Sequence, residues 1–404
     1  MTFMLSACLD NKKLVGERVD VINQLGSSES LVPINVPSMV ESRSWGISLE
    51  QGQSANYFLS ENPEQVWSYN LNSKRIVVTP VVIDGKIIVL DEAGKLQCID
   101  LMTGQTVWDF SVLPLNEPKI SLFGGGLVPD SLGNLYIATS AGEIISFSTK
   151  SNSLNWRLKA DAPFLAAPVL VGDSLFVTDT SNVTISISLD GTLNWSLKGS
   201  SYNHIRAKTG RPEVLGRLLL IPRVSGDLLA VDKETGAEEW YAKFNFTREG
   251  HTQNTFGPFD GQPLVSEGRI YFGSLKGKFL ALDNQGKKLW EVNIGLQGSP
   301  LLISDSIFFV SDTNYLVRIN KADGSIIWSK KLGEKNELET FFSPVLLGSK
   351  LWISSTNGKL VSFDVLKGDV ADEFSFSSGL GGPPVHNLRS LILYTSSSEL
   401  IGLE

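Results

Sequence analysis

Residue types that carry out catalysis or bind metals are scarce in this chain. Its 404 residues include only two cysteines, Cys8 and Cys98, and three histidines, no two of which are neighbours. These numbers give neither a disulfide framework nor a recognisable zinc-ligand spacing. The chain also has no glycine-rich phosphate loop, no nucleophile elbow and no HExxH sequence. We therefore expect no catalytic residue, no metal site and no cofactor.

The individual thiol and imidazole groups have ordinary structural explanations. Cys98 falls on an expected strand, where a lone cysteine is more often a small core residue than a reactive thiol. His204, His251 and His386 are expected in loops. His204 and His251 could approach each other in space, but a single such pair is more typical of a polar surface than of a metal site.

Cys8 points to covalent lipidation. The sequence Leu5-Ser6-Ala7-Cys8 resembles the lipobox of bacterial lipoproteins, in which the cysteine becomes the lipidated first residue of the mature chain. Only seven residues precede Cys8, fewer than a charged and apolar leader needs, so either the true start lies upstream or the match is accidental. We predict lipidation at Cys8, and we interpret residues 1–43 as a truncated leader followed by a flexible tether. No later stretch is long and apolar enough to predict a transmembrane helix.

Composition predicts a folded protein that does not bind nucleic acid. Hydrophobic residues make up 42% of the chain and charged residues 19%, too few charges for a disordered chain. The 35 lysines and arginines against 43 acidic residues give a net charge of -8, and no basic run is present. A surface that follows a phosphate backbone is therefore not expected.

A motif of about 44 residues recurs through residues 44–404. Its clearest copy, residues 80–108, begins with short apolar runs at 81–83 and 87–90. Asp84-Gly85 lies between these runs and predicts a tight hairpin, because both central residues of a type I′ turn need positive φ.

The second half of the copy predicts another hairpin. A third strand is expected over residues 96–99, followed by turn residues from Asp100 to Gly104. The aspartate can accept hydrogen bonds from backbone amides, and the glycine can supply a left-handed conformation. Trp108 then falls on a fourth strand. Each copy therefore predicts a sheet of four antiparallel strands.

Seven full copies follow this pattern. The opening residue and the final aromatic residue are 27 to 30 residues apart in every copy, whereas the connections vary from 10 to 23 residues. A rigid unit with variable connections is typical of a β-propeller blade. The copies run from Pro80 to Trp108, Leu127 to Trp156, Pro168 to Trp195, Pro212 to Trp240, Pro263 to Trp290, Pro300 to Trp328 and Pro344 to Phe374, with phenylalanine in place of tryptophan in the last copy.

The two ends of the repeat region supply an eighth unit. After residue 384 we expect three strands and no fourth strand. Trp67, in contrast, marks a fourth strand that is not preceded by the other three strands of its unit. Pairing these two parts completes a blade and removes open edge strands. We therefore predict an all-β, eight-bladed β-propeller of four-stranded antiparallel blades over residues 44–404, with the last blade closed by an N-terminal strand. We assign the tryptophan of each blade to packing between blades; Trp45 and Trp352 fall outside this register.

The signature Asp-x-x-Thr-Gly-x-x-x-Trp, present at 100–108 and 232–240, resembles the tryptophan-docking repeat of PQQ-type propellers. Two families share that repeat, the quinoprotein dehydrogenases and the outer-membrane protein assembly factors of the BamB family. The lipobox-like Cys8, the length and the split last blade are similar to the BamB family over essentially the whole chain. Residues 14–19 and 123–126 resemble its alphaproteobacterial form.

This resemblance implies a non-enzymatic scaffold lipoprotein of the outer-membrane β-barrel assembly (BAM) complex. The implied partners are the insertase BamA, through its periplasmic repeats, the other subunits of the complex, and nascent outer-membrane β-barrel proteins. A lipid anchor on Cys8 would hold the protein in the outer membrane at its periplasmic face. Leu9, rather than an aspartate after the cysteine, fits outer-membrane sorting.

The resemblance also implies binding residues in two long connections, which flank the fourth blade. Members of the family dock onto BamA through a Leu-x-Leu-Arg loop before the fourth blade and an Asp-x-Asp stretch before the fifth. Aromatic and arginine side chains in such loops are typical of interfaces. By position, the predicted partner-binding residues are His204, Ile205, Arg206, Phe259 and Asp260.

Two departures from the family pattern leave alternatives open. Asn203 stands where the first leucine is expected, and Pro258 stands where the first aspartate is expected. The contact could be rearranged, or Arg206 and Asp260 could pair with each other. The alternative function is a periplasmic PQQ- or sugar-binding propeller with a ligand in the axial funnel. Quinoprotein dehydrogenases, however, are longer and use a vicinal cysteine disulfide, which this sequence lacks.

Overall fold

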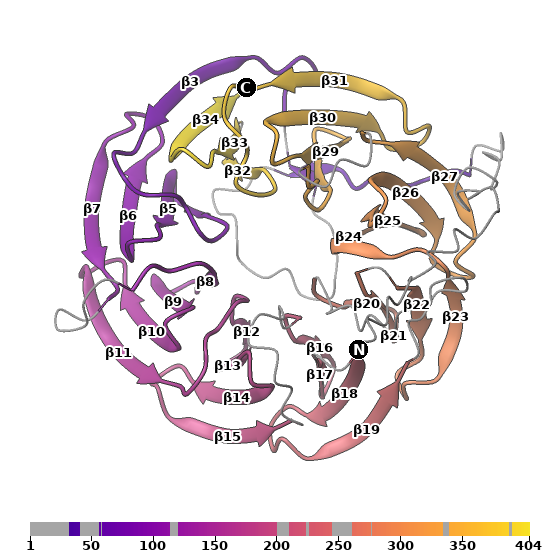
Figure 1. Ribbon diagram of the computed structural model, residues 1–404, viewed down its shortest axis with the longest axis horizontal. Helices are drawn as coiled ribbons and strands as arrows, with labels where there is room; N and C mark the ends of the chain where they lie inside the picture. Colours follow the sequence, from indigo (N-terminus) through magenta and orange to yellow (C-terminus); the bar gives the residue numbers. More distant parts are fainter. Residues whose placement is uncertain are drawn as a thin grey trace, which may run out of the picture.

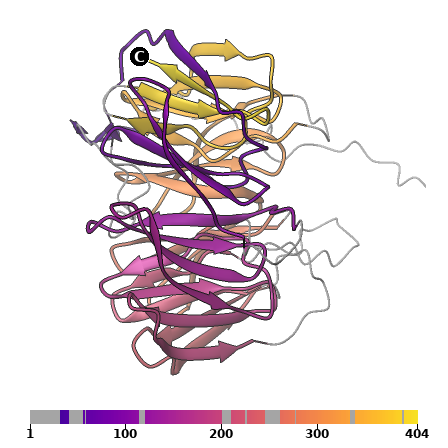
Figure 2. The same ribbon diagram turned by 90° about the vertical axis from the view of Figure 1, so that its left-hand side faces the viewer.

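Eight sheets surround a central axis in the computed structural model of the protein (Figure 1). The structure describes residues 32–40, 56–57, 59–113, 120–199, 210–223, 226–244, 261–275, 277–333, 339–387 and 390–404. Within these ranges the regular secondary structure consists of β-strands alone. The side view shows the sheets standing next to one another around a thick ring (Figure 2). The predicted eight-bladed propeller is confirmed.

The first blade shows how the sequence forms each unit. Its order from axis to rim is β4 (Val81–Ile83), β5 (Lys86–Leu90), β6 (Lys95–Asp100) and β7 (Thr106–Ser111), all antiparallel. The turn between β4 and β5 has φ of 48° at Asp84 and 74° at Gly85. Positive φ at both positions is what the Asp-Gly pair predicts.

The turn between β6 and β7 is organised by Asp100. Its Oδ1 accepts hydrogen bonds from the backbone N–H groups of Met102 and Thr103, each at 3.0 Å, and from Thr103 Oγ1 at 3.1 Å. These hydrogen bonds, led by the Thr103 N–H, lower the pKa of the Asp100 carboxyl. Gly104 follows with φ of 69°, and a Cβ there would overlap the ring of Tyr69 in the neighbouring blade.

The next six blades repeat this order of strands. They consist of β8 (Gly125–Pro129), β9 (Asn134–Thr139), β10 (Glu143–Ser148) and β11 (Ser153–Lys159); β12 (Val169–Val171), β13 (Ser174–Thr178), β14 (Val183–Ser188) and β15 (Leu193–Lys198); β16 (Glu213–Leu215), β17 (Leu218–Pro222), β18 (Asp227–Asp232) and β19 (Glu238–Lys243); β20 (Leu264–Ser266), β21 (Arg269–Gly273), β22 (Phe279–Leu282) and β23 (Lys288–Val292); β24 (Leu296–Ile303), β25 (Ser306–Ser311), β26 (Tyr315–Asn320) and β27 (Ile326–Lys331); and β28 (Val345–Leu347), β29 (Lys350–Ser354), β30 (Lys359–Asp364) and β31 (Val370–Ser375).

The eighth blade joins the two ends of the propeller. Strand β3 (Gln65–Asn70) pairs antiparallel with β34 (Glu399–Leu403), which continues to β33 (Ser390–Tyr394) and β32 (Val385–Asn387). Beyond this ladder, the backbone groups of Glu64 and Glu404 exchange two hydrogen bonds of 2.9 and 3.0 Å. The predicted closure by an N-terminal strand is therefore confirmed.

The hydrophobic core lies between neighbouring blades. One cluster combines Tyr271 and Phe279 of the fifth blade with Phe309 of the sixth, and all three side chains are fully buried. The rings of Phe279 and Phe309 stack with centroids 4.9 Å apart. Because both faces of a blade are covered in this way, most residues of its three inner strands are buried, which explains the short continuous apolar runs in the sequence.

Tryptophans of the outer strands dock on the following blade. In five blades the indole N–H donates to a backbone carbonyl in the next blade's turn between its third and fourth strands. Turn glycines lie under these rings; a Cβ at Gly191, for example, would lie 3.0 Å from the indole of Trp156. The predicted packing role is confirmed by the hydrogen bonds from Trp156 to Leu189 (2.8 Å), Trp195 to Lys233 (3.0 Å), Trp240 to Asn284 (2.9 Å), Trp290 to Lys321 (3.2 Å) and Trp328 to Leu366 (2.8 Å).

The seventh blade differs from the prediction. Phe374 was expected at the tryptophan position, but the strand register places Asp372 there, opposite Ser362. Phe374 lies two residues further along and packs against Trp352, with ring centroids 6.3 Å apart. Trp352 is fully buried on β29. The assignment of Phe374 as the docking aromatic is therefore wrong.

The closure of the ring explains this substitution. The third and fourth strands of the eighth blade come from opposite ends of the propeller, so no turn connects them and no turn carbonyl is available to an indole. Asp372 instead accepts hydrogen bonds from Ser362 Oγ and from Lys350 Nζ, the latter at 2.9 Å. Lys350 also donates to the Glu61 carbonyl at 2.6 Å. A charged pair thus ties the seventh blade to the segment that leads into β3.

Two short strands extend the sheet of the seventh blade. Strand β1 (Met39–Val40) pairs parallel with β2 (Asn56–Tyr57), and β2 pairs parallel with β28 through Tyr57 and Leu347. Upstream, residues 32–36 pack against the sixth and seventh blades. Part of the segment that we expected to act as a tether is therefore in contact with the propeller. Among the described residues, no helix is long and apolar enough to cross a membrane.

Candidate functional site

All of the predicted site residues lie outside the described residues. These are Cys8, the expected lipidation site, and the partner-binding candidates His204, Ile205, Arg206, Phe259 and Asp260. The structure does describe the segments on both sides of the two connections, namely β15 and β16 for the first and β19 and β20 for the second. The geometry of these flanking segments shows where the two connections begin and end.

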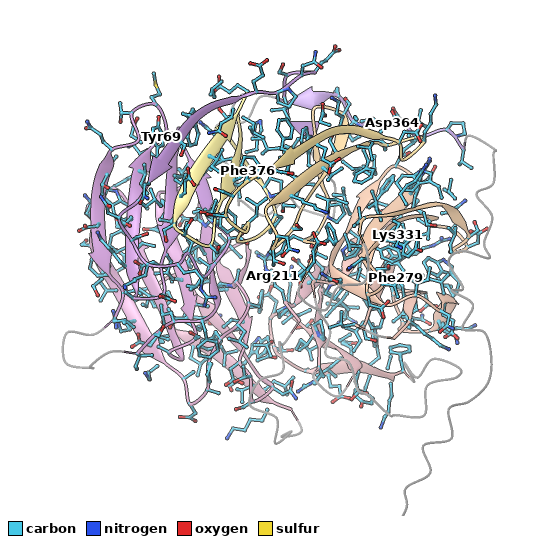
Figure 3. All side chains as sticks on the ribbon, turned by 45° about the horizontal axis from the view of Figure 1, so that its top comes forward. Tyr69, Arg211, Phe279, Lys331, Asp364 and Phe376 are labelled. Carbon is cyan, nitrogen blue, oxygen red and sulfur yellow. The ribbon has the colours of Figure 1, made fainter. Side chains whose placement is uncertain are left out.

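The ends of the two connections meet beside the axis. Arg211 follows the first connection and Gln262 follows the second, and Arg211 Nη1 donates to Gln262 Oε1 at 3.2 Å. Arg211 Nη2 also donates to the Pro168 carbonyl of the third blade at 2.8 Å. One arginine therefore links the entry segments of the third, fourth and fifth blades, and Figure 3 shows Arg211 toward the centre of the ring.

A partly buried carboxylate completes this cluster. Gln262 Nε2 donates to Glu213 Oε2, and the backbone N–H of Val214 donates to Glu213 Oε1 at 3.0 Å. Burial raises the pKa of Glu213, opposed by these hydrogen bonds and by the charge of Arg211. Burial also lowers the pKa of Arg211, opposed by the charge of Glu213. The amide of Gln262 thus bridges a cation and an anion that balance each other.

A cavity of about 950 Å³ lies on the axis of the ring. All eight blades contribute to its wall, mostly through the segments that precede their innermost strands and, in the sixth blade, through the start of β24. Much of this wall is glycine, small residues and apolar side chains, among them Phe123, which is 60% exposed. Arg211 is the only charged side chain among the described lining residues.

Hydrogen bonds between the entry segments hold this wall together. Each bond joins one blade to the next around the axis. After the Arg211 links they run from Gln262 N–H to Ser299 Oγ (3.2 Å), from Ser299 N–H to Ser343 Oγ (2.8 Å), from Ser354 Oγ to the Gly382 carbonyl (2.8 Å) and from Tyr394 Oη to Thr79 Oγ1 (3.5 Å). These bonds make the cavity wall a structural element of ring closure.

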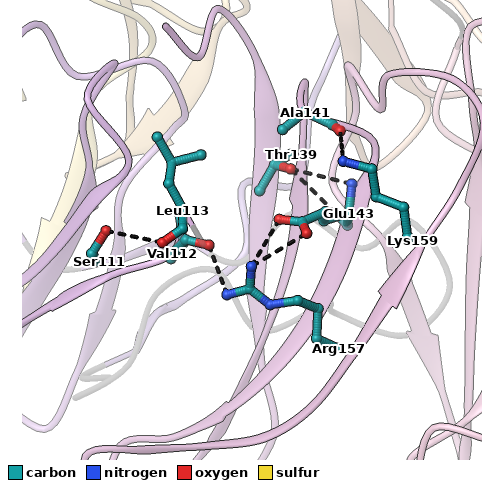
Figure 4. Close-up of polar contacts among 8 residues, drawn as sticks. All are labelled: Ser111, Val112, Leu113, Thr139, Ala141, Glu143, Arg157 and Lys159. Carbon is teal, nitrogen blue, oxygen red and sulfur yellow. Dashed lines mark hydrogen bonds and ion pairs between the residues drawn. The ribbon is translucent and has the colours of Figure 1, made fainter. Parts of the chain in front are cut away.

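A largely buried ion pair within the second blade also contacts the first blade (Figure 4). Arg157 Nη1 lies 3.2 and 3.1 Å from the two carboxylate oxygens of Glu143, whose side chain is almost completely buried. Arg157 Nη2 donates to the Val112 carbonyl of the first blade at 2.8 Å. This pair satisfies its own charges and fixes the seam between the blades.

The groups with potential for catalysis are placed as structural residues. Cys98 is buried opposite Trp108 in the strand register, and burial raises the pKa of its thiol to about 11. His386, expected in a loop, instead lies in β32 and is buried. In the part of the chain that the structure describes, no three His, Cys, Asp or Glu side chains are grouped so that they could hold a metal ion.

Sequence reasoning missed a contact made by Arg318. This fully buried side chain on β26 donates from Nη2 to the carbonyl of Val32 at 2.9 Å, linking residues 286 positions apart. The signal was available, because Arg318 stands opposite Trp328, where the other repeats have a small residue. The short segment around Val32 carries too few residues to show a periodicity by itself.

Comparisons with known proteins agree with this architecture. The BamB protein of Moranella endobia is 22% identical over 84% of this chain and 89% of its own length. The crystal structure of BamB from Moraxella catarrhalis matches with a TM-score of 0.72 at 18% identity, covering 85% of this chain and 100% of that chain. Quinohemoprotein alcohol dehydrogenase from Comamonas testosteroni matches with a TM-score of 0.64 at 12% identity, covering 87% and 78%. At these identities the structural likenesses show the shared fold alone.

The family comparison is more specific than the fold. The model of the family described as outer membrane protein assembly factor BamB matches residues 92–330 and 259–393. These matches include blades from the first to the eighth, and therefore most of the propeller. On this basis the chain belongs to the BamB family of outer membrane protein assembly factors.

Proposed function

We propose that this protein is a non-enzymatic scaffold lipoprotein of the outer-membrane β-barrel assembly machinery. In this function it binds a BamA-like insertase and other subunits, and assists the folding and insertion of outer-membrane proteins. The observation that carries the proposal is the match of the BamB family model over most of the propeller. The name of the Moranella endobia relative, an outer membrane protein assembly factor, supports the same function.

The insertase is proposed to dock on the face formed by the connections between blades. Arg206 and Asp260 belong to the two connections whose ends meet at Arg211 and Gln262. That hydrogen bond, together with the partly buried Glu213 cluster, gives both connections a rigid base. Rigid positioning lowers the entropy cost of binding through loops and therefore favours an interface at this face.

Anchoring is proposed to occur through a lipid on Cys8, at the periplasmic face of the outer membrane. The lipobox-like sequence before Cys8 supports this assignment. The chain between Cys8 and the docked residue Val32 has 23 residues. At roughly 3.5 Å per extended residue, such a tether could span up to about 80 Å.

The absence of enzymatic activity is part of the proposal, and the character of the cavity supports it. Its one charged lining residue among those described, Arg211, already binds Gln262 and the Pro168 carbonyl and is balanced by the nearby Glu213. A catalytic or cofactor site typically combines several convergent polar groups with perturbed pKa values that face the ligand. Here the perturbed pair is used to hold the wall.

Reversal of one charge tests the docking face. We expect Arg206→Glu to abolish co-purification of the tagged full chain with the BamA-like insertase, because a carboxylate would replace the proposed donor to an acidic partner surface. The melting temperature should remain nearly unchanged, since the substitution lies in a connection between blades.

Arg217→Glu is the matched control. Arg217 belongs to the same blade but lies in the turn between β16 and β17, on the opposite face of the ring, and its side chain is 65% exposed. Its exposed pairs with Asp232 and Glu239 contribute little to stability. This variant should retain the insertase. Retention of the insertase by Arg206→Glu as well would refute the assignment of the docking site.

A further inference from the structure

One blade breaks a rule that the other seven obey. On the third strand of each blade, the residue opposite the docking tryptophan or its counterpart lies beneath that side chain. In seven blades this residue is small, and in the sixth blade it is Arg318. The small residues are Cys98, Ser146, Ser186, Ala230, Ala281, Ser362 and Gly402.

Arg318 is held by neutral oxygens. The side chain is 0% exposed, and its guanidinium donates to Ser306 Oγ at 3.0 Å, to the Leu366 carbonyl at 3.1 Å and to the Val32 carbonyl at 2.9 Å. Burying a cation is costly unless its donors are satisfied. Two of the three acceptors belong to the propeller, and the third is supplied by the N-terminal segment. One donor of this buried cation is therefore satisfied from outside the propeller, by a backbone carbonyl of the segment that covers it.

The segment that supplies this carbonyl is extended and alternates in burial. Val32, Ile34 and Val36 are partly buried against the sixth and seventh blades, whereas Pro33 and Asn35 are exposed. The cluster that they contact includes Phe308, whose ring lies 5.8 Å from the Arg318 guanidinium carbon. We call the apolar surface formed by this cluster of the sixth and seventh blades, together with Arg318, the seam groove; it contacts every second side chain of an extended segment.

Recognition of this kind does not depend on one sequence. Pro33 has no N–H group, so it cannot donate in a strand ladder. The described contacts are one backbone carbonyl that accepts a hydrogen bond from Arg318, and apolar side chains at alternate positions. Many extended segments with apolar residues at every second position can meet these requirements.

We propose that the seam groove is a binding site for extended, alternately apolar peptide segments, occupied in this structure by the chain's own residues 32–36. The identity of the partner rests on the proposed function: it is an unfolded strand of an outer-membrane β-barrel protein, in which apolar and polar residues alternate. The N-terminal segment then acts as an internal competitor, which a client strand displaces.

Covalent attachment explains why the chain's own segment occupies the groove. A tethered segment reaches an effective concentration on the order of millimolar. A free peptide at micromolar concentration therefore cannot displace an attached segment that has the same intrinsic affinity for the groove. A test therefore has to weaken the attached segment first. Ile34→Asp combined with Val36→Asp does this, because both side chains would bring a charge into an apolar groove.

The experiment measures binding of a fluorescent peptide with the sequence of residues 30–38 to the full chain by fluorescence anisotropy. We expect the Ile34→Asp, Val36→Asp chain to bind this probe at least about ten-fold more tightly than the unaltered chain, because its groove is free. A probe carrying the same two aspartates should not bind. A third peptide, with valine and serine alternating over nine residues, should displace the bound probe.

Three results would overturn the proposal: no binding of the probe to the doubly substituted chain, equal binding of the aspartate-bearing probe, or failure of the alternating peptide to compete. Arg318→Met in the doubly substituted chain should also abolish probe binding. Because this substitution removes a buried group and could impair folding, the peptide controls carry the test independently. Co-purification of the insertase is tested separately by Arg206→Glu, which lies outside the seam groove, so failure of the proposed function would be distinguished from failure of this proposal.

Discussion

At the scale of single residues, this fold assigns structural roles to groups that elsewhere perform chemistry. Cys98 is the small residue opposite Trp108, and Arg211 and Glu213 balance each other in the wall of the axial cavity. The sequence was sufficient to predict the role of Cys98, because a lone cysteine on a strand is usually a core residue. It could not reveal the Arg211 cluster, since these residues meet only when the ring forms.

The ionisation of Cys98 gives a prediction at this scale. Burial raises the pKa of its thiol from 9.0 to about 11, so the folded chain holds the proton more tightly than the unfolded chain does. Stability contributed by the neutral thiol is therefore complete below pH 9 and is lost as the pH rises from about 9 to about 11. Urea unfolding at several pH values should show a steeper alkaline loss for the parent chain than for Cys98→Ala. Identical pH profiles for the two chains would contradict this account.

At the scale of the blade, the sequence predicted what local rules determine. Asp84-Gly85 predicted a hairpin, and the motif from Asp100 to Gly104 predicted the next turn, because both depend on neighbouring residues alone. The assignment of Phe374 failed for a physical reason. The tryptophan position exists to reach a turn in the following blade, and the eighth blade has no such turn, so Asp372 and its partner Lys350 replace the indole.

This replacement predicts an unequal effect of two lysine substitutions. Lys350→Met should lower the free energy of unfolding by about 2 kcal/mol, because it leaves the largely buried Asp372 carboxylate without its counter-charge and the Glu61 carbonyl without this donor. Lys330→Met removes a more exposed pair with Asp369 and should cost less than about 0.5 kcal/mol. Urea denaturation of both variants measures the difference. Equal losses would show that the Lys350 pair does not replace the docking tryptophan.

At the scale of the whole molecule, closure of the ring could be predicted because the count of strands requires it. Three strands after residue 384 and one strand around Trp67 complete a blade, and β3 indeed pairs with β34. Docking of residues 32–36 could not be predicted in the same way, because the segment is short and contains a proline. Arg318 marks its position only when the third strands of all blades are aligned.

The central claim is that this propeller serves as a scaffold on the insertase. Its most direct test is purification of the tagged full chain from gently solubilised outer membranes, followed by identification of the bound proteins by mass spectrometry. We predict a BamA-like insertase as a near-stoichiometric partner, retained in the Arg217→Glu chain. Recovery of the folded chain from these membranes without any insertase would contradict the account.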